Sequence, residues 1–330
     1  MQEERDARTN FSSIVLFGIL SIVCAEMFSG SAPLWMWDLW GLLVVLPLYW
    51  GHGLLLLNIA LRYQKTSVTH LYILGIIYGL YESWMTKVIW AGYMGQDPQF
   101  GQFLGFAIGE FLVIALFWHA IFSFIVPIFV FQILGSKWGE FTITKKRIAV
   151  FGVIVLIASI FIPTGLVFDL GATIVAVLSN GLLLTVAIGV TKALHPHGFA
   201  LDSLRLGKRG LSIVGAYILL LYVFLFIVIF PERIAPPFTL MLTVLFYLLV
   251  IAMFYFSKEK QLAPDIMTDV SGFNRKHILA GFAIIFALAI LWTLLSPIAS
   301  ILGTLLYLGM VIAGPMLFII ALLQVMTRRI

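Results

Sequence analysis

The sequence predicts an all-α membrane protein, a polytopic bundle of about ten transmembrane helices. Of its 330 residues, 62% are hydrophobic and 11% are charged, whereas a soluble domain carries about 25% charged residues. The mean hydropathy is +1.09. Apolar runs that approach the roughly 20 residues needed to cross a bilayer recur along the whole chain. This composition argues against a soluble enzyme, a secreted domain and a nucleic-acid-binding protein.

The predicted spans are apolar runs bounded by charged residues, proline or glycine. They cover about 12–29, 39–61, 71–91, 103–134, 148–168, 171–191, 211–230, 237–256, 278–296 and 298–326. Two stretches, 148–191 and 278–326, are interrupted only briefly, at Phe168–Gly171 and at Ser296-Pro297. Because each stretch is too long for one span, each is predicted to form a helical hairpin.

The positions of the charges predict the orientation. With the N-terminus in the cytoplasm, 18 of the 20 Lys and Arg residues fall in cytoplasmic segments, and only Arg233 and Lys87 do not. Because basic residues concentrate in cytoplasmic loops, we expect both termini in the cytoplasm and a multi-pass protein in the cell membrane. Lys87, near the outer end of the third span, is expected to reach the interface and to pair with Glu110 or Asp38.

No loop is long enough for a separate domain, so residues 1–330 are predicted to form one integral membrane domain. Within it, 1–134 carries the polar residues of the first four spans, 148–191 is a hairpin, and 211–330 holds apolar scaffold spans. There is no P-loop, dinucleotide-binding or Cys-x-x-Cys motif, so no cofactor is predicted. The net charge of +5 comes from basic residues in the predicted cytoplasmic segments, where they can contact anionic lipid headgroups. Membrane lipids are therefore the expected partners, other membrane subunits are left open, and no nucleic acid is expected.

Glu82 is the most informative polar residue, because it lies near the middle of the third span. Gly75, Tyr78, Gly79 and Glu82 fall on one stripe of a helix. The Gly-x-x-x-Gly spacing allows a neighbouring helix to approach closely, so Glu82 is predicted to point into the bundle. A carboxylate there could carry protons, bind a cation, activate water or form a structural hydrogen bond.

His119, on the fourth span, is the second candidate. Gly101, Gly105 and Gly109 precede it at spacings of four and predict a small-residue packing strip, so that His119 also faces protein. Glu82 and His119 can meet if the third and fourth spans pack as neighbours. Glu110 lies nine residues before His119, which puts the two on opposite sides of a regular helix.

His52 and Asn180 complete the candidate set. His52 lies between two glycines near the middle of the second span, and Asn180 lies on a packing face of the sixth. His52, Glu82, His119 and Asn180 are expected at similar depths in the bilayer, so all four are candidate substrate-binding residues. Whether they converge on one site is left open. Zinc needs three protein ligands and a water at a catalytic site. Because no ligand-spacing motif is present, no metal site is predicted.

Three segments resemble an uncharacterised family of polytopic membrane proteins from bacteria and archaea. They are Ala25-Glu26-Met27-Phe28-Ser29-Gly30-Ser31-Ala32-Pro33, Tyr78-Gly79-Leu80-Tyr81-Glu82 and His119-Ala120-Ile121-Phe122-Ser123. The resemblance covers under half of the chain and implies a multi-pass membrane fold without an assigned activity.

A glutamate on one span and a histidine on the next also resemble the CAAX-protease and bacteriocin-processing intramembrane peptidases. Glu82, His119 and Asn180 match positions of that family's motifs. Tyr81 and Ala176 stand where the family has a second glutamate and a second histidine. The resemblance implies a hydrolytic site at the three matching residues.

Three functions follow from these observations. The first is a transporter or permease with a midplane polar site around Glu82, which would contact the substrate or couple an ion. The second is an intramembrane hydrolase, in which Glu82 would activate water and His119 would stabilise the oxyanion as catalytic residues. The third is a non-catalytic scaffold or assembly subunit. The transporter is preferred, while enzymatic activity and the identity of a small-molecule or lipid substrate are left open.

Overall fold

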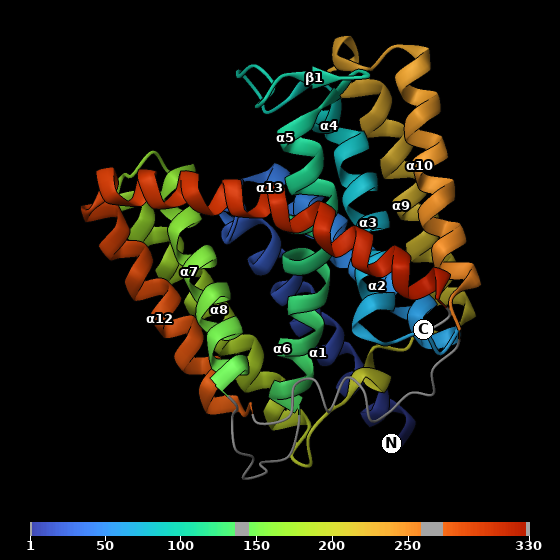
Figure 1. The fold of residues 1–330 in the computed structure, drawn as a ribbon. Coiled ribbons are helices and arrows are strands. Elements are labelled where there is room, and N and C mark those ends of the chain that lie inside the picture. The colour runs from blue at the N-terminus through green and yellow to red at the C-terminus, as the bar shows by residue number, and fades with distance from the viewer. Residues whose placement is uncertain (1, 136–144, 259–272, 328–330) are drawn as a thin grey trace. The chain divides into compact units, whose positions relative to one another are not determined.

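The computed structural model describes residues 2–135, 145–258 and 273–327, which are almost entirely helical (Figure 1). The predicted all-α class is confirmed for these residues. Eight described helices are long and apolar enough to cross a membrane. They are Gly41–Arg62, Ile108–Gly135, Ile148–Gly165, Leu170–Leu194, Lys208–Val228, Pro237–Phe256, Arg275–Leu294 and Ser296–Met326.

The elements follow one another along the chain with short connections. The first part holds α1 (Gln2–Ile22), the π-helix η1 (Val23–Met27), η2 (Trp35–Trp37), the π-helix η3 (Gly41–Val45), α2 (Leu46–Arg62), α3 (Val68–Thr86), α4 (Val88–Ala91), β1 (Gln102–Phe103), β2 (Phe106–Ala107), α5 (Ile108–Glu110), the π-helix η4 (Phe111–Ile125) and α6 (Val126–Gly135). The second part holds α7 (Lys145–Gly165), α8 (Leu170–Leu194), η5 (Leu201–Leu204), α9 (Lys208–Val228), η6 (Pro231–Arg233), α10 (Pro237–Phe256), α12 (Arg275–Leu294) and α13 (Ser296–Met326).

Two of the ten predicted spans are not among these eight helices. The apolar part of the first, Phe11–Met27, is shorter than the others. The third is divided at Lys87, whose φ of 60° lies in the left-handed region and separates α3 from α4. Both predicted hairpin breaks are confirmed, since α7 and α8 are separate helices, as are α12 and α13. Ten spans in total stays a prediction.

The fourth predicted span begins later than expected. Residues 102–107 form a two-stranded antiparallel hairpin, with Gln102 opposite Ala107. Leu104 and Gly105 have φ values of 52° and 82°, which is the backbone of a tight two-residue turn. Because Gly101 and Gly105 lie outside the helix, the predicted glycine packing strip is wrong.

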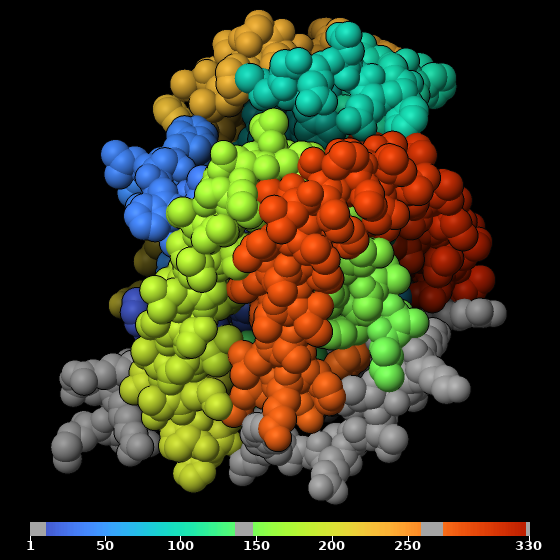
Figure 2. Space-filling model, turned by 90° about the vertical axis from the view of Figure 1, so that its left-hand side faces the viewer, coloured from blue at the N-terminus to red at the C-terminus, as the bar shows by residue number. Residues whose placement is uncertain are grey.

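Contacts divide the chain into two compact units, and the first comprises 1–53, 126–205 and 266–306. Helix α1 forms part of its core, where Leu16, Phe17 and Leu20 have no exposed surface. It packs against α6 and α8. Figure 2 shows α12 between α8 and α7, and α12 contacts both.

The second unit comprises 54–125, 206–265 and 307–330. Its centre is the pair α3 and η4, and α9 and α10 pack against α3. The Tyr72 hydroxyl lies 2.7 Å from the Leu116 carbonyl oxygen and 3.2 Å from that of Gly314. This contact links α3 to η4 and to the last part of α13.

Candidate functional site

Helices α3 and η4 approach closely because small residues face each other across their interface. A Cβ atom on Gly75 would lie 2.6 Å from Ala120 Cα, and one on Gly79 would lie 2.9 Å from Ala115 Cα. These distances leave no room for any side chain. The predicted role of the Gly-x-x-x-Gly spacing is therefore confirmed, and the stripe that ends at Glu82 faces a neighbouring helix.

Glu82 and His119 meet across this interface. Glu82 Oε2 lies 3.0 Å from His119 Nε2, and His119 Nδ1 lies 2.8 Å from Ser123 Oγ. The side chains of Glu82 and His119 are 12% and 5% exposed, and Ser123 is fully buried. The Tyr78 ring packs 5.8 Å from the imidazole, centroid to centroid. The three polar groups thus form a continuous chain of carboxylate, imidazole and hydroxyl.

The direction of this chain follows from donor chemistry. An ionised carboxylate only accepts, so in the state with Glu82 ionised His119 Nε2 carries the proton and donates it to Glu82. In the neutral imidazole, Nδ1 then accepts from the Ser123 hydroxyl. Both ring nitrogens are engaged, which holds the imidazole in one orientation.

The π-helical form of η4 changes which residues share a face. Its i→i+5 hydrogen bonds give more than four residues per turn, so nine residues make about two full turns. Glu110, directly before η4, and His119 therefore lie toward the same side, and the prediction of opposite sides is wrong. Pro127, the second residue of α6, follows the π-helix closely. It lacks the N–H that would bond to the Ser123 carbonyl.

Glu110 is a second buried carboxylate in this unit, with no exposed surface. Its Oε1 accepts from the backbone N–H of Gln99 at 3.0 Å, and its Oε2 is buried without a hydrogen-bond partner. Burial raises the pKa of the Tyr93 phenol, in the loop after α4, well above its ordinary value. The neighbouring Tyr307 and the charges of Glu110 and Glu82 raise it further. Tyr93 is therefore within electrostatic range of both carboxylates.

Lys87 has a structural role, as predicted, but its partners differ from those that were expected. It is fully buried, and its ammonium donates to the Leu225 carbonyl at 3.0 Å and to the Ile229 carbonyl. It also lies 5.3 Å from the centre of the Phe226 ring. These carbonyls belong to the C-terminal end of α9, where the helix dipole favours a cation. Contrary to the prediction, backbone carbonyls hold the ammonium, rather than a carboxylate.

Replacing Lys87 by methionine is expected to destabilise the protein by about 1 to 3 kcal/mol, because two charged hydrogen bonds are lost at similar volume. Chemical unfolding in detergent, followed by tryptophan fluorescence, measures the change. Lys208→Met is the matched control, because Lys208 is exposed at the start of α9. Equal stability of both variants would contradict the role assigned to Lys87.

The other two candidate residues, His52 and Asn180, belong to the first unit. His52 is buried, and its Nδ1 lies 3.0 Å from the Leu48 carbonyl oxygen on its own helix. Asn180 is fully buried, accepts from the Trp35 indole at 3.0 Å, and donates to the Pro33 carbonyl at 3.0 Å. Its amide thus fastens the loop after η1 to α8.

Asn180→Leu is expected to lower stability by about 1 to 3 kcal/mol, because the buried indole N–H of Trp35 and the Pro33 carbonyl lose their partner. The single cysteine, Cys24, is buried in the same unit. A thiol-reactive dye therefore reports when this unit opens on heating. Ser179→Ala is the control, since the Ser179 hydroxyl bonds only within α8. An unchanged midpoint for Asn180→Leu would contradict this role.

Some members of the site were not identified from sequence. The sequence places Ser123 four residues after His119, which is one helical turn. Its hydrogen bond to the imidazole depends on side-chain geometry that spacing does not determine. Tyr93 and Tyr307 gave no signal, because one lies in a loop and the other in an apolar span. In the described ranges, no group of three or more His, Cys, Asp or Glu side chains could hold a metal ion.

Comparison with known proteins identifies a family. A profile described as an uncharacterized membrane protein family matches residues 15–330. An uncharacterized protein of Archaeoglobus fulgidus is 36% identical over 127 residues, which are 37% of this chain and 38% of that protein. No solved structure matches. These matches do not support the resemblance to CAAX proteases. The chain is a multi-pass membrane protein and belongs to this uncharacterized membrane protein family.

Proposed function

We propose that this chain is a proton-coupled transporter of the cell membrane, in which Glu82 and His119 bind the coupling proton. The observation that carries the proposal is the 3.0 Å contact between Glu82 Oε2 and His119 Nε2 in a largely buried helix interface. Ionisable side chains within membrane segments are rare and typically mark ion or substrate pathways.

The chemistry of the pair suits reversible protonation. With Glu82 ionised and His119 neutral, the pair carries one negative charge, and one added proton neutralises it. Ser123 extends the chain of exchangeable protons on the far side of the imidazole. A change of one charge in a medium of low dielectric constant strongly alters the relative energies of two conformations. Proton binding could in this way be coupled to movement of a substrate.

Glu110 and Tyr93 support a path for protons within the same unit. Tyr93 is in electrostatic range of both Glu110 and Glu82, and Glu110 Oε2 is buried without a hydrogen-bond partner. A buried carboxylate oxygen without a partner is costly, which makes Glu110 unusual for a purely structural residue. We propose that Glu110 exchanges protons with the outer face and Tyr93 lies between it and Glu82.

The proposal includes ten spans with both termini in the cytoplasm. Beside the eight long helices, Phe11–Met27 is an apolar helix, and α3 together with α4 covers 68–91 apart from Lys87. Helix α3 is not among the eight because its polar residues, His70 and Glu82 among them, lower its mean hydropathy. The distribution of basic residues favours this topology.

An uptake screen tests the transporter. The full chain, reconstituted in vesicles of phosphatidylethanolamine and phosphatidylglycerol, is exposed to a mixture of amino acids, organic acids and sugars with and without an inward proton gradient. Mass spectrometry of the vesicle contents then measures accumulation. We expect gradient-dependent accumulation of at least one compound, which Glu82→Gln and His119→Phe abolish.

Glu232→Gln is the matched control, because Glu232 is an exposed carboxylate in the turn η6. It should leave accumulation unchanged. Gradient-driven accumulation that persists in Glu82→Gln would contradict the proposed role of Glu82. If no compound accumulates although the protein is folded, the transporter proposal fails and a scaffold or assembly role is favoured.

The order of carboxylate, imidazole and hydroxyl also favours a second candidate, an intramembrane hydrolase with Ser123 as nucleophile. One observation counts against it. Ser123 has no exposed surface, so a substrate in this conformation has no access to its hydroxyl. A fluorophosphonate probe distinguishes the two functions, because labelling of the native protein that is lost in Ser123→Ala would favour the hydrolase.

A further inference from the structure

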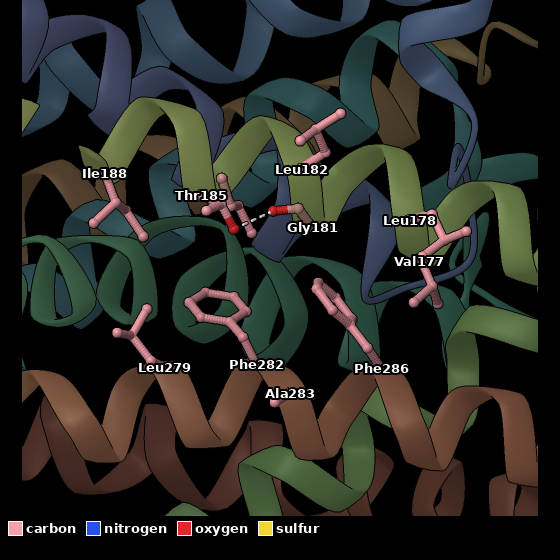
Figure 3. Close-up of a pocket in the computed structure, with 11 residues that line it drawn as sticks. Val177, Leu178, Gly181, Leu182, Thr185, Ile188, Leu279, Phe282, Ala283 and Phe286 are labelled. Atoms are coloured by element: carbon pink, nitrogen blue, oxygen red, sulfur yellow. Dashed lines mark hydrogen bonds between the residues drawn. The ribbon is translucent and has the colours of Figure 1, made fainter. Parts of the chain in front are cut away.

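An apolar groove of about 370 Å³ lies between α8 and α12 of the first unit (Figure 3). The Phe282 and Phe286 side chains project from α12 toward α8 in this view. Thr185 is the polar lining residue, and its hydroxyl donates to the Gly181 carbonyl at 2.8 Å. The walls therefore suit a hydrocarbon chain and offer a polar ligand little to bind.

Small residues create the groove. Gly181 has no side chain, and a Cβ there would lie 3.1 Å from the Phe286 ring. Ala283 adds only a methyl group on the opposite wall. Leu178 and Leu182, along one edge, are 64% and 67% exposed. In a membrane, that edge faces lipid chains, so the groove is open to them.

Two cations lie one helical turn beyond one end of the groove. The two helices are antiparallel here, so that Ile188 on α8 and Leu279 on α12 line the same end. Lys192 follows Ile188 by four residues, and Arg275 precedes Leu279 by four. The two cations lie near enough for Arg275 to act electrostatically on Lys192, and an anion between two like charges relieves their repulsion.

Arg275 is oriented by the protein. Its Nε and Nη2 donate to the Leu134 carbonyl at the end of α6, at 3.3 and 3.0 Å. A guanidinium is planar and holds its N–H donors in a fixed fork, so these two bonds fix the orientation of the whole group. The planar group matches phosphate oxygens better than an ammonium does.

We propose that the α8–α12 groove binds one anionic phospholipid, with an acyl chain along the groove and its phosphate at Lys192 and Arg275. The two parts of the site match the two parts of this ligand. Basic positions between membrane helices on the cytoplasmic side are suited to anionic headgroups, and a 370 Å³ apolar groove can take hydrocarbon.

Native mass spectrometry of the delipidated full chain in detergent tests the headgroup. Phosphatidylglycerol and phosphatidylcholine with identical acyl chains are added separately, and the lipid retained after collisional activation is compared. We expect preferential retention of phosphatidylglycerol. Lys192→Gln should weaken it about fivefold, and Lys192→Gln with Arg275→Gln about 25-fold. Lys208→Gln, which removes a cation from the start of α9, should change nothing.

A second pair of variants tests the groove itself. Ala283→Phe fills the groove and should reduce retention of phosphatidylglycerol, whereas Ile284→Phe, at the neighbouring exposed position outside the lining, should not. Equal retention of the two lipids, or no effect of Lys192→Gln, would overturn the phosphate site. Retention that Ala283→Phe leaves unchanged would overturn the position of the acyl chain. Thermal unfolding followed through Cys24 verifies that each variant is folded.

Discussion

Gly75→Ala is expected to destabilise the protein by about 3 kcal/mol or more. The added Cβ would lie 2.6 Å from Ala120 Cα. This neighbour is backbone, which cannot rotate away as the end of a flexible side chain can. The two helices must separate, and the contact between Glu82 and His119 is then lost. Gly79→Ala should act in the same direction, with its Cβ 2.9 Å from Ala115 Cα.

Gly215→Ala is the matched control for this prediction. Gly215 lies inside α9, in the same unit, and a Cβ there meets no atom within 4 Å. Alanine at an open helical position is neutral or stabilises by up to about 1 kcal/mol. Unfolding of the three variants, followed by tryptophan fluorescence, gives the comparison. If Gly75→Ala were as stable as Gly215→Ala, the close approach of α3 and η4 would be refuted.

A double-mutant cycle on Glu82 and His119 is expected to give a coupling energy of about 1 to 2 kcal/mol. Hydrogen bonds between membrane helices reach about 1.7 kcal/mol, and an ionised partner strengthens them. Glu82→Leu alone leaves the imidazole N–H without its acceptor, and His119→Leu alone leaves a buried carboxylate without its donor. Each single change should therefore cost about 1 to 3 kcal/mol, and the double change less than their sum.

Ser83 supplies the control cycle. Its hydroxyl donates to the Gly79 carbonyl on its own helix at 2.5 Å, so Ser83→Ala and His119→Leu should be additive within about 0.5 kcal/mol. Equal, near-zero coupling in both cycles would show that the contact between Glu82 and His119 contributes nothing to stability.

Much of the fold was predictable because bilayer thickness and hydropathy determine where helices occur. The Gly75 and Gly79 spacing also indicated a close helix contact, and the short connection between two spans made a meeting of Glu82 and His119 possible. Both expectations are confirmed, since local periodicity and chain connectivity were sufficient to derive them.

The remaining features depend on geometry that periodicity does not encode. A π-helix and an α-helix have the same hydrophobic composition, so the shift of Glu110 toward the side of His119 could not be read from spacing. The partner of Asn180 is Trp35, 145 residues away. The left-handed backbone of Lys87 and its contact with the end of α9 likewise require the packed structure.

Infrared difference spectroscopy between acidic and alkaline pH, on the purified protein in lipid nanodiscs, tests the central claim most directly. The proposed proton site predicts a carbonyl stretching band of a protonated carboxylic acid that disappears in Glu82→Gln and shifts in His119→Phe. The band should remain in Glu232→Gln. A difference spectrum of Glu82→Gln identical to that of the unmodified protein would contradict proton binding at Glu82.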